Sequence, residues 1–243
     1  DVCSSDLCNW HCAYCQVPGL VRGAAPEIDL AQLEDELRRF LDELLHGSFM
    51  ADHVPPEAQV IRDIAFSGNG EPTSSKAFAE VVERVVERFG AVIVNDISAG
   101  ELDPRMCAVV ARHGLPYVAM HMRGTPASMQ EMTAYRNVGE EVAGYFREKT
   151  AALEAAGVRR DRIVLDPGFG FAKTLEQNYE LLRGLHRLAE LGYPVLAGVS
   201  RKSMIYKLIG TTPAEALNGT TALHWECLRQ GAVILRADRK SVV

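Results

Sequence analysis

Polar residues recur directly after short apolar runs in the C-terminal two-thirds of this 243-residue chain. They are Asn95 with Asp96, His121, Asp166, the run from Ser200 to Lys202, and Arg236. Carboxylate and amide oxygens accept hydrogen bonds, whereas lysine and arginine donate them and offset negative charge. One polar residue after a strand means little, because loops are polar. Five such cases in succession favour a binding or catalytic site.

Strand and helix patterns alternate after residue 90 and would position these polar residues. The expected strands are short apolar runs at residues 92–94, 118–120, 163–165, 195–197 and 233–235. The expected helices are residues 103–113, 138–156, 174–191 and 213–230, ended by Gly114, Gly157, Gly192 and Gly231. This alternation predicts an α/β fold with a parallel sheet, a partial TIM-type (β/α) barrel. The carboxyl ends of its strands would gather the polar residues on one rim.

The first ninety residues predict fewer elements. Leucines at helical spacing indicate a helix over residues 26–45, with Asp29 and Gln32 resembling a capping box. A short strand is expected at residues 60–66, followed by a turn-rich run and by a helix with one apolar face at residues 78–89. This strand would be the sixth, beside five in the C-terminal part.

Four of the six cysteines lie in the first fifteen residues, and Cys8, Cys12 and Cys15 form a C-x3-C-x2-C motif. Three thiolates at this spacing could hold a [4Fe–4S] cluster and leave one iron open. Zinc and inert thiols are the alternatives. Zinc normally takes a fourth protein ligand, and His11 is constrained between two cysteines. The uneven distribution argues against an extracellular disulfide scaffold and favours a reducing cytoplasm.

Composition excludes several classes of protein. The net charge is −6 and no basic stripe is present, so nucleic acid is not an expected partner. No apolar run reaches the roughly 18 residues that a membrane span needs, and no signal peptide is recognised. The apolar share, 47%, suffices for a buried core.

The motifs over residues 91–237 resemble those of dihydropteroate synthase. They are, in family order, VNDIS at 94–98, MHMRGTP at 120–126, LDPGFGFAK at 165–173, SRKSM at 200–204, GTTA at 219–222 and ILR at 234–236. The resemblance implies a transferase of folate biosynthesis. It would condense 6-hydroxymethyl-7,8-dihydropterin diphosphate with p-aminobenzoate, giving 7,8-dihydropteroate and diphosphate. It also implies a homodimer.

The resemblance assigns roles to individual residues. Asp166 would accept hydrogen bonds from the amidine-like edge of the pterin, Asn95 would meet the remaining polar edge, and Lys202 would donate to the ring. The residues implied as lining the flat faces of the ring are Ile97, Met122, Phe171 and Gly198. Phe171 and Ser200 match p-aminobenzoate contacts.

The resemblance places Arg236 at the diphosphate leaving group, so that Asp166, Lys202 and Arg236 form the implied catalytic set. It also implies Mg²⁺, but the family's magnesium-binding asparagine has no counterpart here. The family's Thr-Arg loop, its pterin-contacting aspartate strand and the histidine two residues after the arginine are missing as well. Low activity is therefore expected of this chain.

Several polar or sulfur-bearing residues have structural interpretations. His121 at a strand end is more often an internally hydrogen-bonded histidine than a catalyst. Asp96 could cap the turn that follows it, and Cys107 and Cys227 fit small core positions.

The N-terminal motif resembles a second family, the radical S-adenosylmethionine enzymes, over residues 8–89. The resemblance implies that Cys8, Cys12 and Cys15 bind a [4Fe–4S] cluster and that its open iron binds S-adenosylmethionine. Glu71, in the run Gly68-Asn69-Gly70-Glu71-Pro72, would meet the amine of this cofactor.

Two partial families joined near residue 90 suggest a chimeric sequence. Residues 1–7 and 238–243 could be encoded by a sequencing-library adapter and its reverse complement, which leaves segments 8–89 and 90–237. Three hypotheses follow: a dihydropteroate synthase-like transferase, a radical S-adenosylmethionine enzyme of unknown reaction, and an inactive chimeric polypeptide.

Overall fold

The structure, a computed structural model, describes residues 7–8, 21–22, 29–53, 56, 78–89, 93–124 and 128–237. Its strands are β1 (Leu7–Cys8), β2 (Val21–Arg22), β3 (Val94–Asp96), β4 (Tyr117–Met120), β5 (Ile163–Asp166), β6 (Leu196–Ala197) and β7 (Ile234–Leu235). Its α-helices are α1 (Leu30–His46), α2 (Phe49–His53), α3 (Phe78–Phe89), α4 (Met106–His113), α5 (Val138–Ala155), α6 (Leu175–Arg183), α7 (His186–Ala189), α8 (Ser203–Ile209) and α9 (Leu217–Arg229).

Strands β3 to β7 are parallel and follow one another in chain order. β3, β4 and β5 form one ladder, in which Asn95 pairs with Val118 and Val118 with Val164. A parallel bridge between Leu165 and Val195 connects β5 to the start of β6, and β6 pairs with β7. The five parallel strands expected of the C-terminal part are confirmed. The sixth expected strand, at residues 60–66, lies outside the described residues.

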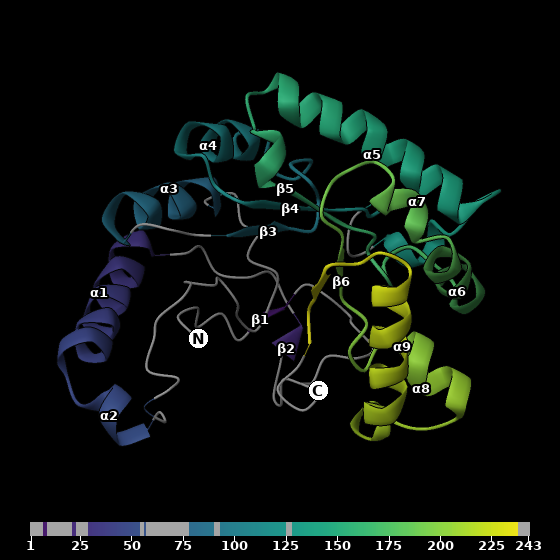
Figure 1. The fold of residues 1–243 in the computed structure, drawn as a ribbon. Helices are drawn as coiled ribbons and strands as arrows, with labels where there is room; N and C mark the ends of the chain where they lie inside the picture. The colour runs from purple at the N-terminus through teal and green to yellow at the C-terminus, as the bar shows by residue number, and fades with distance from the viewer. Residues whose placement is uncertain are drawn as a thin grey trace.

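The helices from α3 onward lie outside these strands, as Figure 1 shows. Parallel strands need such helical crossovers, and the helices cover the outer face of the sheet. The helix α5 is an example, because Phe146 and Leu153 are at most 1% exposed and belong to the same apolar cluster as Ile163 and Leu165 of β5. Burial of each such side chain stabilises the fold by roughly 2 kcal/mol.

The glycines expected to end helices have the required backbone. Gly114, Gly157, Gly192 and Gly231 all have positive φ, between 61° and 100°, which a residue without Cβ adopts at little cost. Their predicted role is confirmed. At the N-terminus of α6, Thr174 and Gln177 form a reciprocal capping box.

Five element boundaries differ from expectation by more than one residue. α1 begins at Leu30, because Asp29 is extended and its carboxylate caps the N–H groups of Ala31 and Gln32. The side chain of Gln32 donates to Glu36, so the expected reciprocal half of this capping box is wrong. The helix expected over residues 174–191 is two helices that break at Gly184.

β3 is the third difference, because it lies at Val94–Asp96 rather than at residues 92–94. A polar residue belongs to this strand since the carboxylate of Asp96 is buried and hydrogen-bonded. The fourth difference is a short 3-10 turn at Pro213–Glu215, which precedes α9 where one helix was expected. The fifth is α4, which begins at Met106 rather than at residue 103. The helix α8 was not predicted. Within the part of the chain that the structure describes, no helix is long and apolar enough to cross a membrane.

Candidate functional site

The polar residues expected on one rim lie at the carboxyl ends of the parallel strands. Asn95 is in β3, Asp166 is the last residue of β5, and Arg236 follows β7 directly. Lys202 is the residue before α8, in the connection after β6. The parallel order of the strands places these four side chains at the same end of the sheet.

Arg236 brings two of the other site residues together. Its Nη2 donates to Oδ2 of Asp166 at 2.8 Å, and its Nη1 donates to Oδ1 of Asn95 at 3.1 Å. The Asp166 side chain is 1% exposed and the Arg236 side chain is 41% exposed. The guanidinium therefore reaches from the solvent side toward a buried carboxylate, and residues 141 positions apart share one hydrogen-bonding group.

Gly198 lies under this guanidinium. A Cβ added to Gly198 would lie 2.5 Å from Nη2 of Arg236, which is closer than two such atoms can approach. The glycine expected to line the site is therefore in contact with the arginine expected at the leaving group. A larger residue would push the guanidinium away from Asp166.

The loop after β5 turns sharply around the carboxylate of Asp166. Oδ1 of Asp166 accepts a hydrogen bond from the backbone N–H of Gly168 at 2.9 Å. Gly168 has a φ of 68°, and a Cβ there would lie 2.1 Å from the carbonyl oxygen of His121. Only glycine fits at this position, and the close approach holds the loop against the end of β4.

Lys202 points toward the same loop. Its Nζ donates to the carbonyl oxygen of Phe169 and lies 4.9 Å from the centroid of the Phe171 ring. Lys202 is 7% exposed, so the cation is held at an aromatic face with little access to solvent.

Apolar side chains form a separate small cluster beside these polar groups. Ile97, Met122 and Phe171, all expected to line the flat faces of a ring, are packed in this cluster at 4–7% exposure. The cluster also contains Met120, Met129 and Ala172. Apolar side chains next to a few converging polar groups are typical of small-molecule sites.

Ser200 lies at the edge of this arrangement and is partly buried. Its Oγ is 3.4 Å from Nε2 of His224 and donates to the carbonyl oxygen of Arg236 at 3.5 Å. Ser200 is thus joined to the arginine that contacts Asp166 and Asn95.

Asp96 has a structural role, as the alternative interpretation held. Its Oδ1 accepts from the N–H and the hydroxyl of Ser98, and its Oδ2 accepts from the N–H of Gly100 and the hydroxyl of Tyr117, all within 2.8 Å. Burial and the nearby carboxylate raise the pKa of Tyr117 well above its usual value. Asp96 therefore fixes the turn after β3, which carries Ile97.

Replacement of this carboxylate should destabilise the fold. We expect Asp96→Ala to lower the free energy of unfolding by about 3 kcal/mol, because it leaves the buried hydroxyl of Tyr117 and two N–H groups without an acceptor. Urea unfolding measures the change. Asp161→Ala, which removes an exposed carboxylate paired with Arg159, is the control and should leave the midpoint nearly unchanged. Equal effects of the two substitutions would contradict this role.

Both isolated cysteines pack as expected of core residues. Cys227 is fully buried and Cys107 packs against the main cluster. Burial raises the pKa of Cys227 to about 12, so its thiol is protonated and unreactive at neutral pH.

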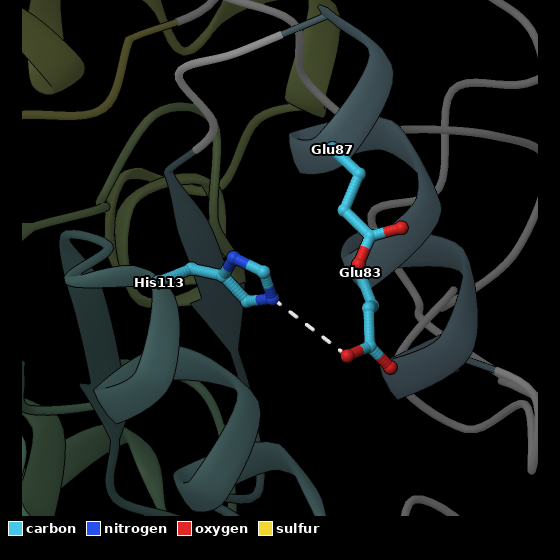
Figure 2. Close-up of side chains that lie close together, drawn as sticks. All are labelled: Glu83, Glu87 and His113. Carbon is cyan, nitrogen blue, oxygen red and sulfur yellow. Dashed lines mark ion pairs between the residues drawn. The ribbon is translucent and has the colours of Figure 1, made fainter.

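The described residues do not provide a magnesium site on this rim. One group of three potential ligands among them, Glu83, Glu87 and His113, has its ligand atoms within 4.8 Å of one another (Figure 2). It lies between α3 and the end of α4, which leads into the opposite end of β4. Glu83 also forms an ion pair with Arg112, whose charge competes with a metal ion. The oxygens of Asn95 and Asp166 face a guanidinium, so the donor set does not fit Mg²⁺.

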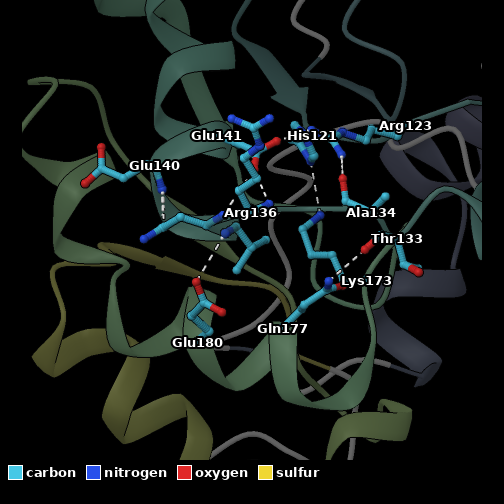
Figure 3. A network of polar contacts seen from close by, with 12 residues as sticks. His121, Arg123, Thr133, Ala134, Arg136, Glu140, Glu141, Lys173, Gln177 and Glu180 are labelled. Carbon is cyan, nitrogen blue, oxygen red and sulfur yellow. Dashed lines mark hydrogen bonds and ion pairs between the residues drawn. The ribbon is translucent and has the colours of Figure 1, made fainter.

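Lys173, to which the sequence motifs assign no role, forms a buried pair with His121, one of the polar residues expected on the rim. Nζ of Lys173 is 3.1 Å from Nδ1 of His121, and the two residues are 5% and 3% exposed. Figure 3 shows the two side chains facing each other. Burial, together with the charges of Lys173 and Arg123, holds the pKa of His121 well below its usual value. His121 is thus an internally bonded neutral histidine, which agrees with its structural interpretation. The signal that could have found Lys173 is its place at the end of the LDPGFGFAK motif, in which the resemblance assigns it no role.

The N-terminal candidates cannot be placed. Cys12, Cys15 and Glu71 lie outside the described residues, and the side chain of Cys8 does as well.

The fold defines a class, a parallel α/β protein of the TIM-barrel type, with a candidate small-molecule site at the carboxyl ends of its strands. The profile of the family described as "Pterin binding enzyme" matches residues 75–238. The chain therefore belongs to the pterin-binding enzyme family.

Three relatives illustrate the similarity. Dihydropteroate synthase of Escherichia coli (strain K12) is 43% identical over 163 residues, which cover 67% of this chain and 57% of that protein. The Thermus thermophilus enzyme in complex with 4-aminobenzoate has a TM-score of 0.62 at 41% identity, covering 67% of this chain and 63% of that one. The Xanthomonas albilineans enzyme in complex with 7,8-dihydropteroate has a TM-score of 0.63 at 32% identity, covering 86% and 70%. The chain thus spans little more than half the length of the Escherichia coli relative.

Proposed function

We propose that this chain carries the pterin site of a dihydropteroate synthase and has low activity in that reaction. The reaction joins 6-hydroxymethyl-7,8-dihydropterin diphosphate to p-aminobenzoate and releases diphosphate. The observation that carries the proposal is the convergence of Asn95, Asp166 and Arg236 in one hydrogen-bonded group at the strand ends. The relatives that bind 4-aminobenzoate or 7,8-dihydropteroate support it.

Recognition of the pterin would rest on the buried carboxylate of Asp166. Two N–H groups on the amidine-like edge of the ring would donate to it, and Asn95 would meet the remaining polar edge. Lys202, already directed toward a carbonyl oxygen, would donate to the ring carbonyl and a ring nitrogen. Ile97 and Met122 would cover a flat face.

Arg236 would have two successive partners. Its guanidinium now meets Asp166 and Asn95 with N–H donors, as the edge of a pterin would, so ring and arginine compete for the same acceptors. Its side chain is sufficiently exposed to swing toward the diphosphate. There it would stabilise the charge that develops on the bridging oxygen.

The chemical step would need positioning and charge stabilisation rather than a strong protein nucleophile. The bond between the pterin methylene carbon and the diphosphate oxygen breaks, and the electron pair leaves with the diphosphate. The amine of p-aminobenzoate forms the new C–N bond and then loses a proton. Phe171 and Ser200 would hold this second substrate in line. No step is assigned to Mg²⁺, because the described residues do not fit it.

The direct test is dihydropteroate formation by the purified chain, measured by chromatography with both substrates present. We expect slow formation that requires both substrates and disappears in Lys202→Ala. Product formation that is unaffected in Lys202→Ala would contradict the proposed site. Pterin binding without turnover would leave the site intact and show that the chain lacks part of the catalytic machinery.

A radical S-adenosylmethionine function remains a prediction that rests on the motif of Cys8, Cys12 and Cys15, and on Glu71 for the cofactor amine. Anaerobic reconstitution with iron and sulfide tests it. The expected result is a brown protein with cluster absorbance that is lost in Cys12→Ala. A colourless wild-type protein would contradict the prediction.

We also propose that residues 8–89 and 90–237 have separate origins, between adapter-derived ends at 1–7 and 238–243. Amplification of the source DNA across codons 85–95 tests this, and a continuous genomic product would contradict it.

We propose in addition that two copies of the chain form a dimer. Exposed apolar side chains on α8 and α9, among them Ile209 and Trp225, support this. Light scattering should then give twice the mass of the chain, and a monomer at all concentrations would contradict it.

A further inference from the structure

Lys173 is buried beneath the loop that carries Asp166 and Phe171. Its Nζ donates to the carbonyl oxygens of Gly168 at 3.1 Å and Phe171 at 2.9 Å, and it lies 3.1 Å from Nδ1 of His121. An ammonium group has three N–H donors, and these three acceptors use all of them. The lysine is therefore bound by the protein on every side.

These contacts connect two neighbouring strand ends. His121 follows β4 directly, whereas Gly168 and Phe171 belong to the loop after β5. The connection after β4 is also joined further out to α6, because the side chain of Gln177 donates to the carbonyl oxygen of Thr133 at 2.7 Å (Figure 3). The outer contact is partly exposed, while the contact through Lys173 is buried. Lys173 is thus a buried side-chain connection between the two loops.

The loop that Lys173 holds has an unfavourable backbone. Gly168 and Gly170 have positive φ, and so does Ala172, at 51°, where a residue with a Cβ is strained. A loop of this kind keeps one shape only if its surroundings hold it. The two carbonyl oxygens bound by Lys173 lie on either side of Phe169, whose own carbonyl oxygen accepts from Lys202.

Ionisable groups surround Lys173 on several elements. Asp166 at the end of β5 is negative, Lys202 before α8 and Arg123 after β4 are positive, and His121 is neutral. Burial lowers the pKa of Lys173 to about 7, with Lys202 and Arg123 adding to the effect and Asp166 opposing it. A charged group that is costly to bury is consistent with a role beyond filling space.

We infer that Lys173 is a positioning residue: it ties the loop of residues 167–172 to His121 and so presents Asp166 and Phe171 to the pterin without touching the ring. This inference rests on the proposed function for its consequence, but its structural content is testable without a ligand. The tie between the loop and His121 can be measured in the chain without ligand. The loss of pterin affinity depends in addition on the proposed site.

Hydrogen exchange in the full chain tests the connection. We expect Lys173→Met, which keeps the apolar stem, to accelerate exchange of the backbone amides of residues 168–172 at least about tenfold, with protection in α5 unchanged. Lys149→Met is the matched control, since Lys149 also ties a loop, by donating to the carbonyl oxygen of Ala99 at 3.3 Å and to Glu101. Unchanged exchange in residues 168–172 would overturn the inference. If Lys173→Met does not fold, His121→Leu removes one of the three acceptors and carries the same test.

The pH dependence of stability tests whether the Lys173 amino group is buried as described. Because its folded pKa is lowered, the unfolded chain binds more protons than the folded chain between about pH 7 and the ordinary lysine pKa of 10.5. The stability of the wild type relative to Lys173→Met should therefore rise with pH across this window. A difference that stays constant with pH would show that the folded pKa of Lys173 is not lowered, which would contradict the buried position of its amino group.

Pterin affinity separates this inference from the proposed function. We expect Lys173→Met to weaken binding of 6-hydroxymethylpterin at least about tenfold and Lys149→Met to leave it unchanged. A wild-type chain that binds no pterin would contradict the proposed function alone, because the exchange result would still decide the role of Lys173. Wild-type affinity in Lys173→Met would overturn the positioning role while the proposed function stands.

Discussion

Asp166→Asn is expected to weaken binding of 6-hydroxymethylpterin by about 100-fold, which corresponds to about 2.7 kcal/mol. The buried carboxylate would accept two hydrogen bonds from the ring edge, and an amide offers one acceptor oxygen and presents N–H donors to the ring's own donors. The loop should persist, because the remaining oxygen of Asn can still accept from the N–H of Gly168. Titration followed by pterin fluorescence measures the change.

The matched control for this substitution is Asp103→Asn. Asp103 is also a buried aspartate that pairs with an arginine, Arg105, but it lies before α4 rather than at the strand ends. Asp103→Asn should leave pterin affinity unchanged. If the two variants bind the pterin equally well, the carboxylate of Asp166 does not recognise the ring.

Arg236→Ala should change the affinities for two related ligands in opposite directions. Affinity for the pterin diphosphate should fall by about 100-fold, since the guanidinium would no longer meet the anion. Affinity for the pterin without diphosphate should rise by about fivefold, because Arg236 no longer competes for Asp166 and Asn95. The gain is small because the arginine is 41% exposed, and an ion pair of this kind contributes only about 1 kcal/mol.

Isothermal titration with both ligands distinguishes the two roles of Arg236. Arg160→Ala, which removes an arginine that contacts Tyr193 away from the strand ends, is the control and should change neither affinity. Equal losses for both ligands in Arg236→Ala would contradict the competition between guanidinium and ring. An unchanged affinity for the diphosphate would contradict the assignment of Arg236 to the leaving group.

The sequence predicts well what local chemistry determines. Gly114 and Gly231 end helices because their backbone requires a positive φ, and this requirement is visible in a single residue. The position of Asp166 and Arg236 at strand ends follows from the alternation of strands and helices, since parallel strands present their carboxyl ends at the same edge.

What the sequence does not reveal depends on contacts between distant segments. The boundary of β3 was misplaced because Asp96 is polar, and its burial depends on the hydroxyl of Tyr117, 21 residues away. The partners of Arg236 are a similar case, because the arginine meets Asn95 and Asp166 only after five strands have paired. Lys173 is the last residue of the LDPGFGFAK motif, but the motif resemblance assigns it no role, and its role emerges only from the approach of His121.

The most direct test of the central claim is a crystal structure of this chain grown with 6-hydroxymethylpterin. We predict that the ring edge donates to the carboxylate of Asp166, that Lys202 approaches the ring carbonyl, and that the guanidinium of Arg236 has moved away from Asp166. A pterin bound elsewhere, or one bound while Arg236 keeps its hydrogen bonds to Asp166 and Asn95, would contradict the account.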